Sequence, residues 1–143
     1  MVVAAQDAAD QPQAEEDPGE VMIERFNASP LEEEIGYSQA IRVGQLVFVS
    51  GTTAAGKTLQ EQLKTIYIRI QSTLAQFDCS MDDVVQERIQ TTDMNALKKA
   101  QNLRKRFYKP GAYPTSTWTE VERLYDEDNL VAVDVVAVIR KFE

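Results

Sequence analysis

Residues 130–139 read L-V-A-V-D-V-V-A-V-I, which is apolar at nine of ten positions. The pattern predicts a strand over residues 130–141 with two apolar faces, because successive side chains of a strand point to opposite faces. The rest of the chain predicts only two helices, enough to cover one face of the sheet. The other face needs a cover, and a second copy of the chain is the simplest one. The sequence therefore predicts a homo-oligomer.

Five further strands are expected from alternating apolar and β-branched residues, at 21–26, 37–43, 46–51, 84–92 and 114–124, with a loop after residue 26 that includes Pro30. Gly44 and Gln45 suit a two-residue hairpin turn. Thr58 opens the first helix, and Glu61 three residues later completes a capping box. One apolar stripe of this helix is predicted to pack on the sheet, formed by Leu59, Leu63, Ile66, Ile70, Leu74 and Phe77. The hairpins among these elements favour an α+β domain with a six-stranded sheet and two helices on one face.

The second helix is predicted to begin after a cap at residues 93–95. Its spacing of apolar residues turns Leu97, Ala100, Leu103 and Phe107 toward the sheet. The opposite side is predicted to be a basic face in water, formed by Lys98, Lys99, Arg104, Lys105 and Arg106. A nucleic-acid footprint is the alternative, but no aromatic residues for base stacking interleave with these charges.

The charges of this 143-residue chain are unevenly placed. Residues 1–20 contain six acidic and no basic side chains, and we expect them to be a disordered acidic tail before a single domain at 21–143.

The chain has no histidine and one cysteine, Cys79, so His-based triads and zinc sites are not predicted, nor is a cofactor. The absence of a long apolar run and of a signal pattern predicts no membrane partner and a cytoplasmic location.

Residues 114–124, P-T-S-T-W-T-E-V-E-R-L, combine a hydroxyl, an indole and a carboxylate on one face of a strand. Ser116, Trp118 and Glu120 alternate with residues of the other face, so they could form one wall of a small polar cleft. The simpler alternative is an edge strand with a solvated glutamate.

Residues 51–58, G-T-T-A-A-G-K-T, satisfy the phosphate-loop pattern between a strand and a helix. Lys57 and Thr58 would contact phosphate and metal, and Asp134 imitates the aspartate that helps to hold Mg²⁺. However, the hairpins indicate an α+β domain, and Asp134 lies within its strand instead of at its exit. Nucleotide binding is therefore disfavoured, although a binding test would decide it.

Three stretches, 36–51, 82–93 and 114–124 with the closing strand, together resemble the YjgF/YER057c/UK114 family, also known as Rid (reactive intermediate deaminase) or endoribonuclease L-PSP-like proteins. The likeness covers roughly residues 21–142. It implies a chorismate-mutase-like α+β fold with a mixed sheet, and a homotrimer with a cleft between each pair of subunits.

Active members of this family hydrolyse enamines or imines such as 2-aminoacrylate and release ammonia. The resemblance places the family's carboxylate-clamping arginine, two residues after a proline, at Ser116. Its water-handling glutamate corresponds to Ala132, with Asp134 at the next acidic position, and its cleft asparagine corresponds to Gln101. The scaffold therefore matches, whereas the usual arginine is missing.

The resulting hypothesis is a Rid-like trimer that binds a small metabolite in an intersubunit cleft and does not deaminate 2-aminoacrylate efficiently. Glu120 is the candidate catalytic residue, and Arg88 is a candidate substitute cation for an anion. The expected ligand-binding residues are Tyr37, Ser50, Gly51, Arg88, Ser116 and Trp118.

Two other functions stay open. The cleft could belong to a deaminase-type hydrolase that acts on a different imine, with Glu120 handling protons or water. Alternatively, the chain could be an endoribonuclease or translation inhibitor that relies on Glu120, Arg88 and the basic face at 98–106.

Overall fold

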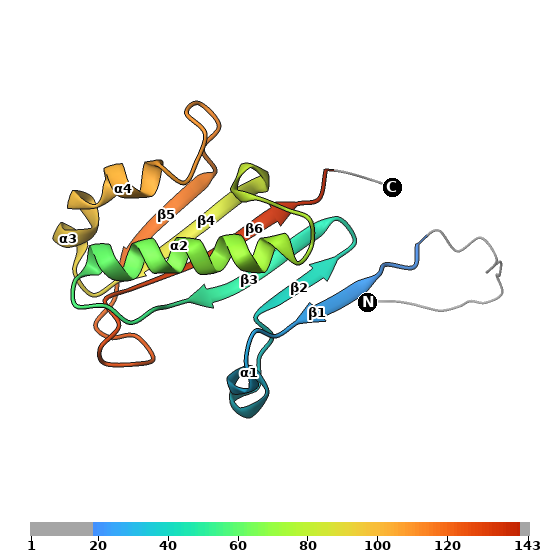
Figure 1. Cartoon of the computed structure of the whole chain (residues 1–143), viewed down its shortest axis with the longest axis horizontal. Coiled ribbons are helices and arrows are strands. Elements are labelled where there is room, and N and C mark those ends of the chain that lie inside the picture. The colour runs from blue at the N-terminus through green and yellow to red at the C-terminus, as the bar shows by residue number, and fades with distance from the viewer. Residues whose placement is uncertain (1–18, 141–143) are drawn as a thin grey trace.

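A six-stranded sheet with a long helix across one face forms the body of the computed structural model, which describes residues 19–140 (Figure 1). Its strand order is β1-β2-β3-β6-β4-β5, and only the β4–β5 pair is parallel. The predicted α+β class and mixed sheet are therefore confirmed. All but the last two residues of the predicted acidic tail lie outside the described residues.

The strands are β1 (Ile23–Phe26), β2 (Ala40–Val43), β3 (Leu46–Thr52), β4 (Val84–Thr91), β5 (Thr115–Glu120) and β6 (Val131–Val138). The helices are α1 (Pro30–Ile35), α2 (Leu59–Ala75), α3 (Met94–Lys99) and α4 (Gln101–Lys105), and a 3-10 turn at Met81–Asp83 precedes β4. In this part of the chain, no helix combines the length and apolar character needed to cross a bilayer.

The apolar strand β6 lies in the interior of the sheet, antiparallel to both β3 and β4. One of its faces is fully buried beneath α2, through Val131, Val133, Val135 and Ala137. The other face, which includes Ala132, Asp134 and Val136, is only half-buried. The two-sided apolar pattern therefore describes a strand with one face in the core and one face on the open side of the sheet.

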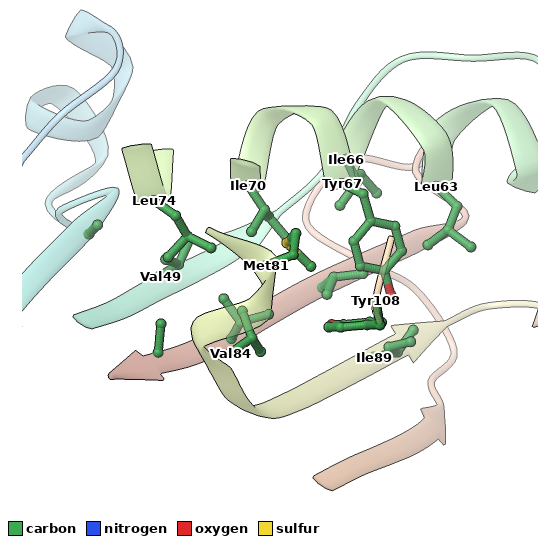
Figure 2. Close-up of a cluster of buried hydrophobic side chains, with 14 of the residues drawn as sticks. Val49, Leu63, Ile66, Tyr67, Ile70, Leu74, Met81, Val84, Ile89 and Tyr108 are labelled. Carbon is green, nitrogen blue, oxygen red and sulfur yellow. The ribbon is translucent and has the colours of Figure 1, made fainter. Parts of the chain in front are cut away.

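Helix α2 supplies most of the cover for the sheet. Thr58 caps it by accepting a hydrogen bond from the backbone N–H of Glu61 at 3.1 Å. The predicted stripe of Leu59, Leu63, Ile66, Ile70 and Leu74 is buried, as Figure 2 shows for four of these residues above Val49, Val84 and Ile89. The stripe excludes water from one face of the sheet, which is the main stabilising contribution of an amphipathic helix.

The predicted loop after β1 was wrong, because it contains the short helix α1. Ser29 accepts a hydrogen bond from the Leu31 N–H at 3.2 Å, and the Glu32 carboxylate accepts one in return from the Ser29 N–H at 3.0 Å. Pro30 occupies the first turn, where its missing N–H is no loss, and Gly36 ends the helix with φ of +102°. These are the signals of a capping box and a glycine C-cap, and they were present in the sequence.

The predicted second helix is divided into α3 and α4. Asp93 caps α3 as expected, by accepting a hydrogen bond from the Ala96 N–H at 3.0 Å, and the break falls at Ala100 with φ of −94° and ψ of 8°. The predicted basic face was wrong at one position. Arg104 is 7% exposed and points beneath the helices, where it forms an ion pair with a buried carboxylate. The other four basic side chains are exposed, namely Lys98, Lys99, Lys105 and Arg106.

The phosphate-loop match has a structural explanation. The Gln62 side chain donates to the carbonyls of Gly56 and Asp128, each at 3.0 Å, and accepts from the Leu130 N–H at 2.8 Å. It thereby joins the loop before α2 to the loop before β6, and Gly56 permits the close approach. The Lys57 N–H already binds the Glu61 carboxylate at 2.9 Å, so an acidic group occupies the amide that a phosphate would need.

We expect Gly56→Ala to lower the free energy of unfolding by about 1–3 kcal/mol. A Cβ at this position would lie 3.0 Å from Gln62 Cγ and 3.1 Å from the Gln62 backbone nitrogen. Gly51→Ala is the matched control, because its Cβ would meet nothing within 4 Å, and we expect a change within about 0.5 kcal/mol. Urea denaturation measures both, and equal costs would contradict the packing explanation.

Candidate functional site

A buried carboxylate, that of Glu87 on β4, is the centre of a polar cluster between the sheet and the helices. Glu87 is 0% exposed. Its Oε1 accepts hydrogen bonds from Arg104 Nε at 2.8 Å and Ser116 Oγ at 2.7 Å, and lies 2.7 Å from Arg104 Nη2. Its Oε2 accepts from the hydroxyls of Tyr67 and, at 2.8 Å, Tyr108. The charge is therefore paired and fully hydrogen-bonded, as a buried charge must be.

Four elements deliver these groups to one point. Helix α2 contributes Tyr67, α4 contributes Arg104, and Tyr108 follows α4 directly. Because β4 and β5 are parallel and in register, Ser116 is the cross-strand partner of Glu87. Burial, reinforced by the nearby Glu87 charge, raises the pKa of Tyr67 and of Tyr108. Both phenols therefore remain neutral donors to the carboxylate at physiological pH.

The guanidinium of Arg104 completes the cluster. Burial works against its charge, but the hydrogen bond and the charge of Glu87 outweigh this and raise the pKa of Arg104. Its Cζ lies 5.2 Å from the ring centroid of Tyr108 and 5.6 Å from that of Trp118, within the range of cation–π attraction. The positive charge is therefore held by one carboxylate and two aromatic rings.

Ser116 and Trp118 meet at the edge of this cluster. Ser116 Oγ donates to Glu87 and accepts from Trp118 Nε1 at 2.7 Å, so the exposed hydroxyl links the buried carboxylate to the indole. Glu120, further along β5, accepts from the Met94 N–H at 2.9 Å at the start of α3. The structure thus brings Ser116 and Trp118 together and gives Glu120 a helix-capping contact.

The other predicted site residues lie elsewhere in the subunit. Ser50, Gly51 and Arg88 line a hollow of about 330 Å³ on the open face of the sheet. Tyr37 and Gly51 line a second hollow of about 450 Å³ beside α1 and α2, where burial and the Glu32 charge raise the pKa of Tyr37. A single subunit therefore separates the predicted cleft into three regions, with Gly51 common to two of them.

The open-face hollow also contains an ion pair. Arg88 on β4 is the cross-strand neighbour of Asp134 on β6, and its Nε lies 3.0 Å from Asp134 Oδ1. Sequence reasoning identified Arg88 but missed Glu87 and Arg104. The alternation along β4 carried a signal for Glu87, which shares its inward face with Ile89 and Thr91.

Comparison with known proteins assigns the chain to a family. Residues 28–139 match the family model described as Endoribonuclease L-PSP. The chain belongs to this family. The RutC family protein YjgH of Escherichia coli is 30% identical over 112 residues, which are 70% of this chain and 84% of that protein. The family resemblance drawn from the sequence is thereby confirmed.

Solved structures agree with this L-PSP assignment. The crystal structure of Rv2704 from Mycobacterium tuberculosis, described as a member of the YjgF/YER057c/UK114 family, superposes with a TM-score of 0.77 at 28% identity, covering 82% of this chain and all (100%) of that one. A solved structure of YjgH gives 0.72 at 27% identity, over 82% of this chain and 96% of the other. The Rid fold is therefore shown.

We predict that the two charges of the buried pair are energetically coupled, so that removing both together costs less stability than the sum of removing each one alone. Glu87→Gln and Arg104→Met should each lower the free energy of unfolding by about 3–5 kcal/mol, because each leaves an unpaired buried charge or an unfilled donor. The double variant should cost clearly less than the sum of the two, since neither charge then lacks a partner.

The matched control is the more exposed ion pair Arg88–Asp134, on the opposite face of β4. Arg88→Met and Asp134→Asn should each change the free energy of unfolding by about 0–1 kcal/mol. Urea denaturation of all five variants is the measurement. Additive costs for Glu87 and Arg104 would contradict a coupled pair.

Proposed function

We propose that this L-PSP-family chain is a Rid-like homotrimer that binds a small metabolite between subunits and is not an efficient 2-aminoacrylate deaminase. The observation that carries the proposal is the state of position 116. A neutral serine stands where the resemblance expects the carboxylate-clamping arginine, and its hydroxyl is already engaged by Glu87 and Trp118.

The trimer is supported by the uncovered face of the sheet. Helix α2 lies across the other face (Figure 1), and α3 and α4 pack against α2. The open face exposes Leu46, Phe48 and Val85 by 40%, 43% and 46%, around the half-buried side chains of β6. Apolar side chains gathered on one sheet face favour burial against another subunit, and the family resemblance makes that subunit a second copy in a trimer.

Assembly would also bring the separated site residues together. The open-face hollow carries Ser50, Gly51 and Arg88, whereas Ser116 and Trp118 lie on the edge strand β5. In the proposed trimer, the β5 edge of one subunit closes the hollow of the next. The cleft would then combine hydroxyls, an indole and the Arg88–Asp134 pair.

The charges around this cleft argue against the usual chemistry. Clamping a substrate carboxylate requires a free cation, preferably one that makes two parallel hydrogen bonds. Arg104 is the cation nearest to Ser116 in the cluster, but Glu87 neutralises it and burial shields it. Glu120 is partly occupied by the Met94 N–H at the start of α3, which argues against Glu120 as a catalytic base.

The two alternative functions have less support. A deaminase for another imine would need a substrate that does not depend on an arginine at position 116. Cleavage of RNA is the activity named in the family description. It would rely on Glu120, Arg88 and the exposed basic side chains Lys98, Lys99, Lys105 and Arg106. The loss of Arg104 to the interior reduces that basic face.

We expect the wild-type chain to sediment as a trimer at micromolar concentration, and Phe48→Glu to shift it toward the monomer. A charge buried between subunits would remain unpaired, which destabilises association. Ile68→Glu is the matched control, because Ile68 is equally apolar and 49% exposed but lies on α2, away from the open face. Sedimentation velocity distinguishes these outcomes, and a monomeric wild type would refute the trimer.

We expect ammonia release from enzymatically generated 2-aminoacrylate to be about 10- to 100-fold slower than for an arginine-bearing relative, expressed as kcat/KM. The factor reflects the loss of a charge-assisted hydrogen bond of about 1.5–3 kcal/mol. Ser116→Arg should raise the rate, whereas Ser116→Met, which is long but uncharged, should not. Wild-type turnover equal to that of the relative would disprove the inactive-cleft proposal.

A further inference from the structure

The open-face hollow presents a cation and an anion side by side. Arg88 Nε and Asp134 Oδ1 are 3.0 Å apart, and their side chains are 64% and 24% exposed. An ion pair this exposed contributes little to folding stability, because water screens it and two long side chains must be ordered. Stability therefore does not explain the pair, and its groups can take new partners at low cost.

Each member of the pair keeps unused hydrogen-bonding capacity. A guanidinium has five N–H donors arranged along two edges, and within residues 19–140 the hydrogen bond of Arg88 to Asp134 uses only Nε. The edge formed by the two terminal nitrogens matches a carboxylate. Asp134 accepts through Oδ1, so with respect to the described part of the chain its Oδ2 remains for a donor such as an ammonium group.

The rest of the hollow suits a small ligand with both polar and apolar parts. Ser50 Oγ donates to the Ser38 carbonyl at 2.6 Å, so its lone pairs remain able to accept from an ammonium group. Ile41 and Phe48 add apolar surface, and Gln86 adds an amide. The volume of about 330 Å³ is at the small end of ligand-binding pockets.

We propose that this hollow binds a zwitterionic α-amino acid with a small apolar side chain, its carboxylate on Arg88 and its ammonium group on Asp134. The inference rests on the proposed intersubunit cleft, because the neighbouring subunit would remove water and strengthen both contacts. A zwitterion adds no net charge to a neutral pair. A lone carboxylate or a lone amine would leave one uncompensated charge at the interface, which is costly.

Isothermal titration of the full-length chain with L-valine, 3-methylbutanoate and isobutylamine tests this selection. Valine carries both charged groups, and each of the other two probes lacks one of them. We expect valine to bind at least about tenfold more tightly than either probe, because each lacks a charge-assisted hydrogen bond. Equal binding of valine and 3-methylbutanoate would overturn the inference in favour of a simple anion site.

Variants test the residues. Arg88→Met and Asp134→Asn should each weaken valine binding by about tenfold or more, whereas Lys98→Met on the exposed basic face should not change it. Sedimentation of the same samples separates the two proposals. A trimer that does not bind valine refutes the zwitterion site and leaves the trimer intact, whereas a monomer refutes both.

Discussion

The buried carboxylate of Glu87 is the constraint on which the helix-covered half of this molecule depends. Moving a charge out of water costs several kcal/mol even after relaxation, so the carboxylate requires every donor that surrounds it. Those donors come from α2, α4, the segment after α4 and β5. One side chain thereby fixes the relative positions of elements that apolar packing alone would leave freer to slide.

The same network determines what the edge strand can do. Among the strands of residues 19–140, β5 pairs with β4 alone, so its position depends on that ladder and on the hydrogen bond between Ser116 and Glu87. That bond and the hydrogen bond from Trp118 place a neutral hydroxyl, already donating and accepting, at the position where the resemblance expects a free cation. A guanidinium does lie in this region, that of Arg104 on helix α4, but the carboxylate of Glu87 neutralises its charge.

Local patterns predicted most of the fold and only part of the site. Alternation identified the strands, the stripe on α2 identified its buried face, and Gly44 with φ of +60° marked the hairpin. Arg104 was misplaced because charged residues of amphipathic helices normally face water. Its spacing of four residues from both Ala100 and Tyr108 nevertheless puts it on the inward side. A buried ion pair depends on a partner distant in sequence, and no local pattern names that partner.

The separation of the predicted cleft into three regions has the same origin. Strand periodicity places Glu87 and Arg88 on opposite faces of β4, and each finds an opposite charge there. The inner pair is buried, and both oxygens of Glu87 already accept hydrogen bonds from other side chains, so this pair offers little to a ligand. The outer pair has one hydrogen bond, unused donors and acceptors, and a hollow beside it. Glu87 and Arg88 are adjacent in sequence but belong to two different ion pairs. The Glu87–Arg104 pair stabilises the fold, whereas the Arg88–Asp134 pair can exchange partners and is the one available for ligand binding.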